Sequence, residues 1–168
     1  MKPKICIITV TFNSSKTIQD TLDSIYEQDY ENFHHIVIDG KSSDNTLEIV
    51  KSHKNKNLTI ISEPDNGIYD AMNKGLLNIN GEIVGFLNSD DMYANNNVLS
   101  NIALVFEDNE IEACYGDLVY VNYENSKIIR YWKSGTYKSS LFSKGWCPPD
   151  RKSTRLNSSH QIISYAVF

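Results

Sequence analysis

Apolar residues in this chain fall into two kinds of segment that alternate along the sequence. Short runs rich in isoleucine and valine are typical of strands, and they cover residues 4–12, 33–39, 58–62 and 82–87. Elsewhere apolar residues recur every three or four positions, which predicts helices over residues 18–26, 47–50, 68–79 and 98–106. Two further runs, 113–121 and 127–132, predict strands around a turn at 122–126.

This order of strands and helices predicts an α/β fold with a mostly parallel sheet and helices on both of its faces. In such sheets ligands bind beyond the carboxyl ends of the strands. Polar residues follow four strand ends in this chain: Thr11 and Asn13, Asp39, residues 63–67, and residues 88–91. We therefore expect these four ends to form one site along a single edge of the sheet.

Two adjacent carboxylates, Asp90 and Asp91, closely follow the fourth predicted strand. Keeping both ionised favours a bound cation or a hydroxyl partner. Ligation by oxygen alone suits Mg²⁺ or Mn²⁺, which take further ligands from substrate phosphates. The pair is therefore a candidate metal site, with a solvated acidic turn that caps the following helix as the alternative.

Asp39 ends the second predicted strand, where dinucleotide-binding folds place an acid that binds ribose. The glycine-rich loop that such folds carry after the first strand is absent, and so is a P-loop. The phosphates of a ligand would then need a metal ion, which agrees with the candidate role of Asp91. In the alternative, Asp39 only stabilises a turn or the start of a helix.

The third predicted helix starts at Gly67, where its first turn offers free N–H groups and the positive end of the helix dipole. Asp70 and Asn73 lie three positions apart, so they share one face and could contact the same ligand. In the alternative, Asp70 favours the dipole and Asn73 is solvated. His34 and His35 point to opposite faces of a strand, which favours structural roles.

Composition narrows the classes of protein that remain. The 168 residues suffice for one ordinary domain, and 40% apolar residues can build a core. A net charge of −5 argues against a nucleic-acid partner. The three cysteines show no metal-binding spacing. No run approaches the roughly 20 apolar residues of a membrane span, and no signal peptide is evident, so we expect a cytoplasmic protein.

The sequence changes character near residue 150. Residues 150–168 contain three basic residues and one acid, including two of the three arginines of the chain. Residues 150–160 (DRKSTRLNSSH) look like the in-frame translation of a sequencing-library adapter. We therefore expect a native domain over residues 1–149 and a foreign tail over 150–168 that packs on nothing specific. The alternative is a genuine polar linker followed by a short strand at 161–168.

Four segments together resemble family-2 glycosyltransferases with the Rossmann-like GT-A fold. They are residues 7–13 (IITVTFN), 38–46 (IDGKSSDNT), 62–75 (SEPDNGIYDAMNKG) and 86–91 (FLNSDD). The resemblance covers residues 4–149 and is closest to the colanic-acid and capsular branch of bacterial exopolysaccharide enzymes.

The resemblance implies which residues bind the sugar donor and its metal. Thr11 and Phe12 would line the base pocket, and Asp39 would hydrogen-bond the base. The other donor-binding residues would be Asn13, Gly67, Asp70, Asn73 and Asp90. Asp90 would lie on the ribose or metal side, and Asp91 would hold Mg²⁺ or Mn²⁺ on the diphosphate.

The chain departs from the family pattern at four places. Val10 stands where many members have proline or threonine, which costs little because the backbone does the binding. Asn88 replaces a frequent first acid of the metal signature, which leaves metal binding to Asp90 and Asp91. Met72 stands where many members have arginine, so one phosphate contact is missing. The Pro-x-His segment and the acceptor-side region of this branch are absent after Pro149.

By resemblance, the intact protein would transfer a sugar from a nucleoside-diphosphate sugar to a hydroxyl of a saccharide or lipid-linked acceptor, with inversion. A base must accept the acceptor proton, and Asp117 is the candidate, with a strand-end turn acid as the alternative. The setting would be cell-surface polysaccharide synthesis, in the cytoplasm or at the inner face of the membrane. Peripheral membrane association of the intact protein stays open. The alternative function is a catalytically incompetent fragment that still binds the nucleotide.

Overall fold

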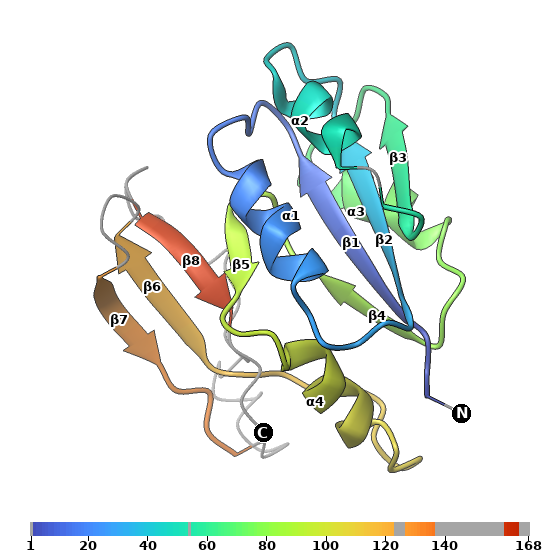
Figure 1. The fold of residues 1–168 in the computed structure, drawn as a ribbon, viewed down its shortest axis with the longest axis vertical. Coiled ribbons are helices and arrows are strands. Elements are labelled where there is room, and N and C mark those ends of the chain that lie inside the picture. Colours follow the sequence, from blue (N-terminus) through green and yellow to red (C-terminus); the bar gives the residue numbers. More distant parts are fainter. Residues whose placement is uncertain (1, 54, 123–126, 137–159, 165–168) are drawn as a thin grey trace.

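The computed structural model describes residues 2–53, 55–122, 127–136 and 160–164. A four-stranded parallel sheet forms from β1 (Ile5–Thr11), β2 (Phe33–Asp39), β3 (Leu58–Ser62) and β4 (Ile83–Phe86). The strands lie in the order β3-β2-β1-β4 (Figure 1), so the first two strands of the sequence occupy the centre. The strands predicted from the sequence are confirmed to within one residue at each end.

Helices α1 (Ile18–Tyr26) and α2 (Thr46–Ser52) cover one face of this sheet. Leu22 of α1 and Val50 of α2 pack there against Val37 of β2, and all three side chains are fully buried. The helical spacing of apolar residues after β1 and β2 therefore directs both helices onto the same face.

Helix α3 (Ile68–Leu76) covers the opposite face, so the predicted α/β fold is confirmed. Its Ala71 packs against Ile8 and Ile36. At Gly75 the helix approaches the sheet so closely that a Cβ atom would lie 2.5 Å from the Ile8 side chain. The helix ends at Leu76 and not at residue 79 as the apolar spacing predicts.

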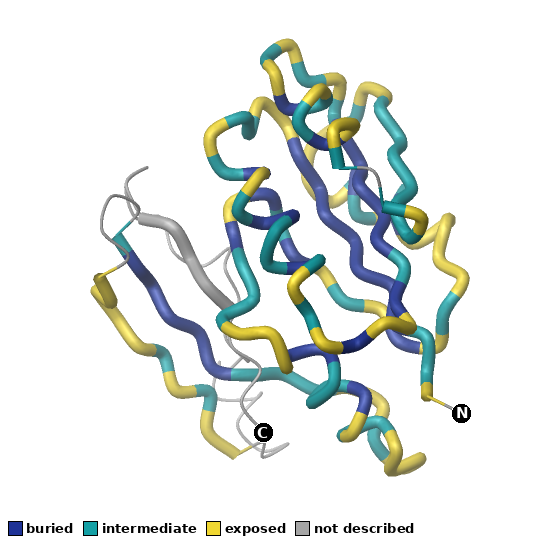
Figure 2. The backbone as a smooth tube through the Cα atoms, viewed as in Figure 1, coloured by how far each residue is buried: buried dark blue, intermediate teal, exposed yellow. Residues whose placement is uncertain are grey.

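The sheet is buried at its centre and open at one edge. Every residue of β1 is buried, and Figure 2 shows β1 and β2 as the dark core of the molecule. On the edge strand β4, Val84 and Phe86 are each 42% exposed. A groove of about 520 Å³ runs along β4, α4 (Val98–Val105) and residues 112–118.

A second sheet lies beside the first, with strands in the order β5-β8-β6-β7. Its strands are β5 (Asp91–Tyr93), β6 (Leu118–Asn122), β7 (Ile128–Trp132) and β8 (His160–Ser164). The predicted hairpin strands exist, although β6 begins at Leu118 and not at residue 113. Residues 123–126 of the predicted turn lie outside the described residues. Neither β5 nor the second sheet follows from the sequence patterns.

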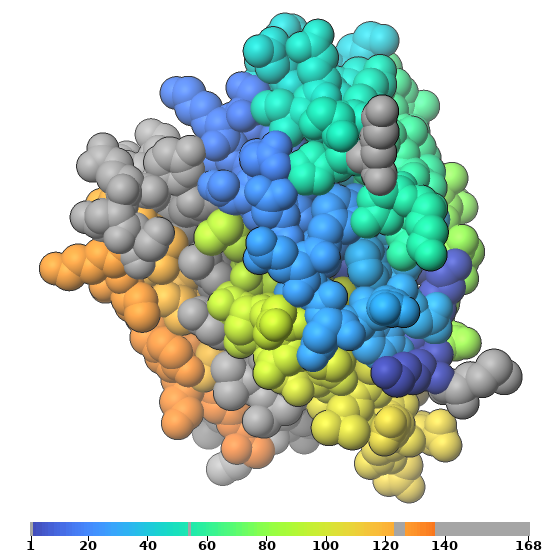
Figure 3. Space-filling view, in the orientation of Figure 1, coloured from blue at the N-terminus to red at the C-terminus, as the bar shows by residue number. Residues whose placement is uncertain are grey.

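The first sheet and β5 are joined through α1. The hydroxyl of Ser24 in α1 accepts a hydrogen bond from the Tyr93 N–H of β5 at 3.1 Å. Figure 3 shows the yellow-green surface of the β5 and α4 region directly beside the blue surface of α1. Among the described residues, no helix has the length and apolar character that crossing a membrane requires.

Strand β8 comes from the segment that the sequence analysis expects to pack on nothing specific. It pairs with β5 in parallel and with β6 in antiparallel orientation, so that expectation is wrong for residues 160–164. Strand pairing uses main-chain groups, which every sequence carries. The pairing therefore does not test the foreign origin of the tail, which stays a prediction. Residues 150–159 and 165–168 lie outside the described part of the chain.

Candidate functional site

The carboxyl ends of the parallel strands meet at one edge of the sheet, which we call the rim. It comprises residues 11–15, 39–46, 62–67 and 88–91. The Gly40 N–H donates to the Thr11 carbonyl oxygen at 2.9 Å, and the Glu63 N–H donates to the Asp39 carbonyl oxygen at 3.0 Å. The prediction that the four strand ends share one edge is therefore confirmed.

Asp39 lies at the centre of the rim, and its side chain is fully buried. One carboxylate oxygen accepts the Ser42 hydroxyl and the other accepts the Ser62 hydroxyl at 2.6 Å. The Ser42 N–H lies 3.2 Å from both oxygens. A buried charge is tolerated only when hydrogen bonds replace its water shell, and these donors supply that replacement.

Three consecutive N–H groups of the β1–α1 loop are bound by side chains of the β2–α2 loop. The pairs are Asn13 N to Ser42 Oγ (2.9 Å), Ser14 N to Thr46 Oγ1 (2.7 Å) and Ser15 N to Asp44 Oδ2 (3.1 Å). We call this set of contacts the loop brace. Folds that cradle phosphate after the first strand use backbone N–H groups of this loop. Here those groups already have partners, which agrees with the absence of a glycine-rich sequence.

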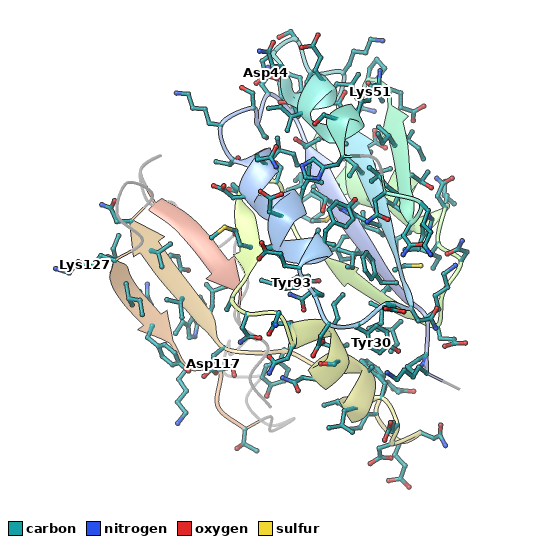
Figure 4. All side chains as sticks on the ribbon, viewed as in Figure 1. Tyr30, Asp44, Lys51, Tyr93, Asp117 and Lys127 are labelled. Carbon is teal, nitrogen blue, oxygen red and sulfur yellow. The ribbon has the colours of Figure 1, made fainter. Side chains whose placement is uncertain are left out.

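Asp44 anchors the loop brace beside the start of α2 (Figure 4). It also accepts hydrogen bonds from the hydroxyl and the N–H of Thr46. The hydrogen bond from the Thr46 hydroxyl is the main reason that the pKa of Asp44 lies well below its usual range. The hydrogen bond from Ser15 lowers the pKa further, and burial opposes both effects. Asp44 is therefore ionised at neutral pH and holds the loop by charge-assisted hydrogen bonds.

The Phe12 ring stands at the outer end of β1 and is 62% exposed. A Cβ atom at Gly40 would collide with the Asp65 carboxylate and lie 3.4 Å from the Phe12 ring, so these three residues form one continuous surface. An exposed aromatic ring beside a small backbone surface suits stacking of a planar base. Thr11, in contrast, is buried.

The turn before α3 is held by its own side chains. Gly67 has a φ of 108°, a left-handed conformation that favours glycine. The Asp70 carboxylate accepts a hydrogen bond from the Asn66 N–H at 2.9 Å. This hydrogen bond lowers the pKa of Asp70, the charge of Lys74 lowers it further, and burial opposes the shift. Asn73 is exposed. Asp70 is thus engaged within the turn, and a shared ligand for Asp70 and Asn73 stays a prediction.

The ammonium group of Lys74 is bound by residues of this turn and of α3. Its ammonium group donates to the Pro64 carbonyl oxygen at 2.6 Å and lies 3.1 Å from Glu63 and 3.5 Å from Asp70. The contact with Glu63 contributes most to a raised pKa of Lys74. The charge of this lysine is therefore already balanced by acids of the protein.

Residues 88–91, which we call the acidic turn, complete the rim beyond β4. The Asp91 N–H donates to the Asn88 carbonyl oxygen at 3.1 Å, which closes the turn. Asp90 is exposed, whereas Asp91 is only 1% exposed. The side-chain oxygen of Asn88 is buried and accepts no hydrogen bond within the described residues.

The donors of the acidic turn fit a hard divalent cation. Asn88, Asp90 and Asp91 offer oxygen ligands only, which is the set that Mg²⁺ and Mn²⁺ prefer. Among the described residues, no group of three or more His, Cys, Asp or Glu could hold a metal. Asp90 is the exposed acid of the pair, and the roles of Asp91 as the principal metal ligand and of Asp90 on the ribose or metal side stay predictions.

Asp117 does not lie at the rim. Figure 4 shows it near the start of β6, at the end of the molecule away from Asp44. One carboxylate oxygen accepts a hydrogen bond from the Tyr131 hydroxyl. The other accepts hydrogen bonds from the Ser134 N–H at 2.8 Å and from the Ser134 hydroxyl at 2.7 Å. Burial opposes ionisation, but these hydrogen bonds prevail and lower the pKa of Asp117. Such contacts favour a structural role at the start of the β6–β7 pair.

Sequence reasoning missed the hydroxyl groups that organise the rim. Ser42, Thr46 and Ser62 bind the loop or Asp39, and Ser89 donates to the Ser14 hydroxyl at 2.8 Å. The sequence signal was a concentration of serine and threonine directly after the strand ends.

Comparison with known proteins places the chain in a family. The sequence profile described as glycosyl transferase family 2 matches residues 6–168. The chain belongs to this family. A family-2 relative from Escherichia coli, the UDP-Glc:alpha-D-GlcNAc-diphosphoundecaprenol beta-1,3-glucosyltransferase WfgD, is 29% identical over 126 residues. That match covers 74% of this chain and 49% of the relative.

Two solved glycosyltransferase structures resemble the family-2 fold of this chain. S. aureus TarS 1-349 in complex with UDP-GlcNAc matches with a TM-score of 0.61 and 29% identity, over 81% of this chain and 37% of that one. Mannosyltransferase PcManGT from Pyrobaculum calidifontis, in complex with GDP-Man and Mn²⁺, matches with a TM-score of 0.59 and 28% identity, over 70% of this chain and 35% of that one. The chain spans less than half the length of these relatives. Together with the parallel sheet and its helices, they identify the fold as GT-A.

Proposed function

We propose that the intact protein transfers a sugar from a nucleoside-diphosphate sugar to a hydroxyl of a saccharide or lipid-linked acceptor, with inversion at the anomeric carbon. Its setting is cell-surface polysaccharide synthesis of the colanic-acid and capsular type, at the cytoplasmic side of the membrane. Family membership supports the reaction class, and a relative that acts on a diphosphoundecaprenol-linked sugar supports the lipid-linked acceptor.

One observation carries the donor-binding part of this proposal. The N–H groups of the β1–α1 loop are bound by the loop brace, and Lys74 is balanced by Glu63 and Asp70, whereas Asp90 stays exposed. A diphosphate at this rim therefore lacks the usual backbone cradle. The exposed acid repels a diphosphate unless a divalent cation lies between them.

Two further cations, Arg130 and Lys41, do not replace such an ion. Arg130 lies over the rings of Tyr120 and Trp132 in the second sheet, 5.6 Å from each ring centre. Lys41 is exposed on the rim, but a single positive charge only partly balances a diphosphate. A bound Mg²⁺ or Mn²⁺ would stabilise the charge on the leaving diphosphate by several kcal/mol.

We assign the nucleotide base of the donor to the half of the rim that contains Phe12, Asn13 and Asp39, which we call the base side; the acidic turn is the other half. Phe12 offers an exposed ring for stacking, with Asn13 beside it. Asp39 is enclosed by Ser42 and Ser62, so it recognises a base either through the Ser42 hydroxyl or after that hydroxyl turns away. In the reaction, the acceptor oxygen bonds to the anomeric carbon, the bond from that carbon to the diphosphate breaks, and a base takes the acceptor proton.

Calorimetric titration of nucleoside diphosphates tests the proposal. We expect UDP or GDP to bind the wild-type chain at least tenfold more tightly with Mn²⁺ than without, and the free nucleoside to show no Mn²⁺ effect. Asp90→Asn should lose the Mn²⁺ effect. Asp29→Asn is the matched control, because Asp29 is equally exposed but lies before β2, at the opposite edge of the sheet.

Hydrolysis of the donor sugar separates the proposed enzyme from its alternative, a fragment that binds nucleotide without turnover. Release of free sugar that requires Mn²⁺ and Asp90 supports catalysis by this chain. Tight Mn²⁺-dependent binding without sugar release supports the incompetent fragment. Diphosphate binding that ignores Mn²⁺ contradicts the metal-dependent mechanism.

A further inference from the structure

A hydrogen bond between two hydroxyl groups joins the two halves of the rim. Ser89 of the acidic turn lies 2.8 Å from Ser14 of the β1–α1 loop, measured between the Oγ atoms. Ser89 is only 7% exposed, so water hardly competes for its hydroxyl. The Ser14 hydroxyl also lies 3.3 Å from the Phe12 carbonyl oxygen. We propose that Ser14 and Ser89 are positioning residues that fix the metal-binding acid relative to the base pocket.

The carbonyl oxygen of Phe12 fixes which group donates in each of these two hydrogen bonds. A carbonyl oxygen can only accept, so the Ser14 hydroxyl donates to Phe12 and accepts from Ser89. The chain thus runs from the acidic turn to the main chain of the residue whose ring is exposed at the rim. Each hydroxyl has one hydrogen to donate, and the acceptor of that hydrogen sets the orientation of the hydroxyl.

The base-side end of the chain is fixed independently. The Ser14 N–H is held by Thr46, and the Ser15 N–H is held by Asp44. Ser89, in contrast, directly precedes Asp90 in the acidic turn, which lies between the Leu87 N–H, bonded to the Ile8 carbonyl oxygen at 3.0 Å, and the start of β5 at Asp91. The Ser14–Ser89 contact therefore adds a side-chain link between the loop brace and the acidic turn, directly beside Asp90.

This inference rests on the proposed function, since only a ligand that spans both halves responds to their spacing. A nucleoside contacts the base pocket alone. A nucleoside diphosphate with Mn²⁺ must reach the base pocket and Asp90 together. Loss of the Ser14–Ser89 hydrogen bond should weaken binding of the nucleoside diphosphate with Mn²⁺ and leave nucleoside binding unchanged. A merely structural role would weaken both ligands together with the folded state.

The test is a double-mutant cycle with Ser14→Ala, Ser89→Ala and the double variant. Kd is measured for the nucleoside and for its diphosphate with Mn²⁺, and thermal unfolding is followed in parallel. Each single variant should weaken the diphosphate complex about three- to tenfold, the range expected for one neutral hydrogen bond, and leave nucleoside binding within twofold. The double variant should lose no more than either single one, because both remove the same contact.

Two control variants complete the design. Ser52→Ala removes an exposed hydroxyl that bonds only to Ile49 of its own helix, and it should change neither Kd. Ser14→Thr keeps the hydroxyl on a half-buried side chain and should restore diphosphate binding.

Additive losses in the double variant, equal losses for both ligands, or unchanged diphosphate binding in both single variants would overturn the inference. The wild-type titration reports separately on the proposed function. If the wild type shows no Mn²⁺ effect, the proposed function fails and the inference with it. If the wild type shows the effect and the serine variants retain it in full, the inference alone fails.

Discussion

The two halves of the rim differ in how far the protein itself satisfies their polar groups. On the base side, the Asp39 carboxylate and the loop N–H groups all have protein partners. On the acidic turn, Asp90 is exposed and the buried side-chain oxygen of Asn88 accepts nothing from the described residues. The carboxylate and the loop amides of the base side are therefore satisfied by the protein, although the buried Thr11 hydroxyl has no hydrogen-bond partner among the described residues, whereas the exposed Asp90 is accessible to a ligand.

This contrast separates stability from binding. Polar groups that are buried and paired contribute to the folded state, and removing one partner leaves the other unpaired. A group exposed at the rim contributes little to folding and is available to an incoming ligand. Substitutions on the base side should therefore lower stability as well as affinity, whereas substitution of the exposed acid should lower affinity alone.

The largest effect is expected from Asp39→Ala. This change leaves the hydroxyls of Ser42 and Ser62 without their buried acceptor, so the free energy of unfolding should fall by about 3 kcal/mol. Nucleoside affinity should also fall, by roughly one to two orders of magnitude. Urea denaturation and calorimetry measure the two quantities. An Asp39→Ala protein as stable as wild type would remove the distinction between the two halves.

The next effect is expected from Asp90→Asn, which should lower diphosphate affinity in Mn²⁺ by about two orders of magnitude. Its free energy of unfolding should change by less than about 0.5 kcal/mol, because the side chain is exposed. Asp91→Asn should lose the Mn²⁺ effect and also some stability, because Asp91 is buried. A destabilised Asp90→Asn protein would show that the acidic turn also supports the fold.

The scaffold beneath the base side predicts a dependence of stability on pH. His35 is fully buried, with its ring nitrogens 3.0 Å from the Tyr26 hydroxyl and 2.9 Å from the Thr9 hydroxyl. Burial, assisted by the charges of His34 and His53, lowers the pKa of His35 from 6.5 to about 3. Between these values the unfolded chain binds a proton that the folded protein does not, so stability falls as pH falls.

The slope from His35 should approach 1.4 kcal/mol per pH unit below pH 6.5 and vanish above it. Urea titrations between pH 4.5 and 7.5 on wild type and His35→Gln isolate this contribution, since the other titrating groups are shared. Equal slopes in the two proteins would show that His35 is protonated without unfolding.

The smallest effect is expected from Lys74→Met. Because Glu63, Asp70 and the Pro64 carbonyl already surround the ammonium group, its loss should change diphosphate affinity less than twofold with Mn²⁺ present. Lys41→Met, which removes the exposed rim lysine, provides the comparison. A tenfold loss in Lys74→Met would place this lysine on the phosphates and weaken the argument for a cation.

The sequence predicts the parallel sheet well, because its strands are short continuous apolar runs, and the runs of the two central strands are buried. It also predicts the rim, since the ends of parallel strands must meet. Strand β5 could not be predicted: Asp91–Tyr93 is too short to show a pattern, and its partner β8 lies far away in the sequence. The pairing of β8 depends on contacts between main chains, which leave no signal in side chains.

The candidate site is predicted in its acids and not in its hydroxyls. Asp39 and Asp90 stand out because a charge after an apolar strand is unusual. Serine and threonine cap helices, form turns and bind solvent equally well, so Ser42 and Ser89 carry no distinct sequence signal. Asp117 shows the limit of reasoning from residue type, because its position directly before an apolar strand does not show that Tyr131 and Ser134 bind its carboxylate, and its role as the base stays a prediction.

The loop brace also determines how the β1–α1 loop behaves in time. Amide hydrogens exchange with solvent only when their hydrogen bonds open, and loops usually exchange fast. The amides of Asn13, Ser14 and Ser15 are held by side chains from another loop, so they should exchange as slowly as those of the neighbouring strands. The entropy of ordering this loop is lost during folding. A ligand that binds beside it meets an immobile surface and does not lose affinity by ordering the loop.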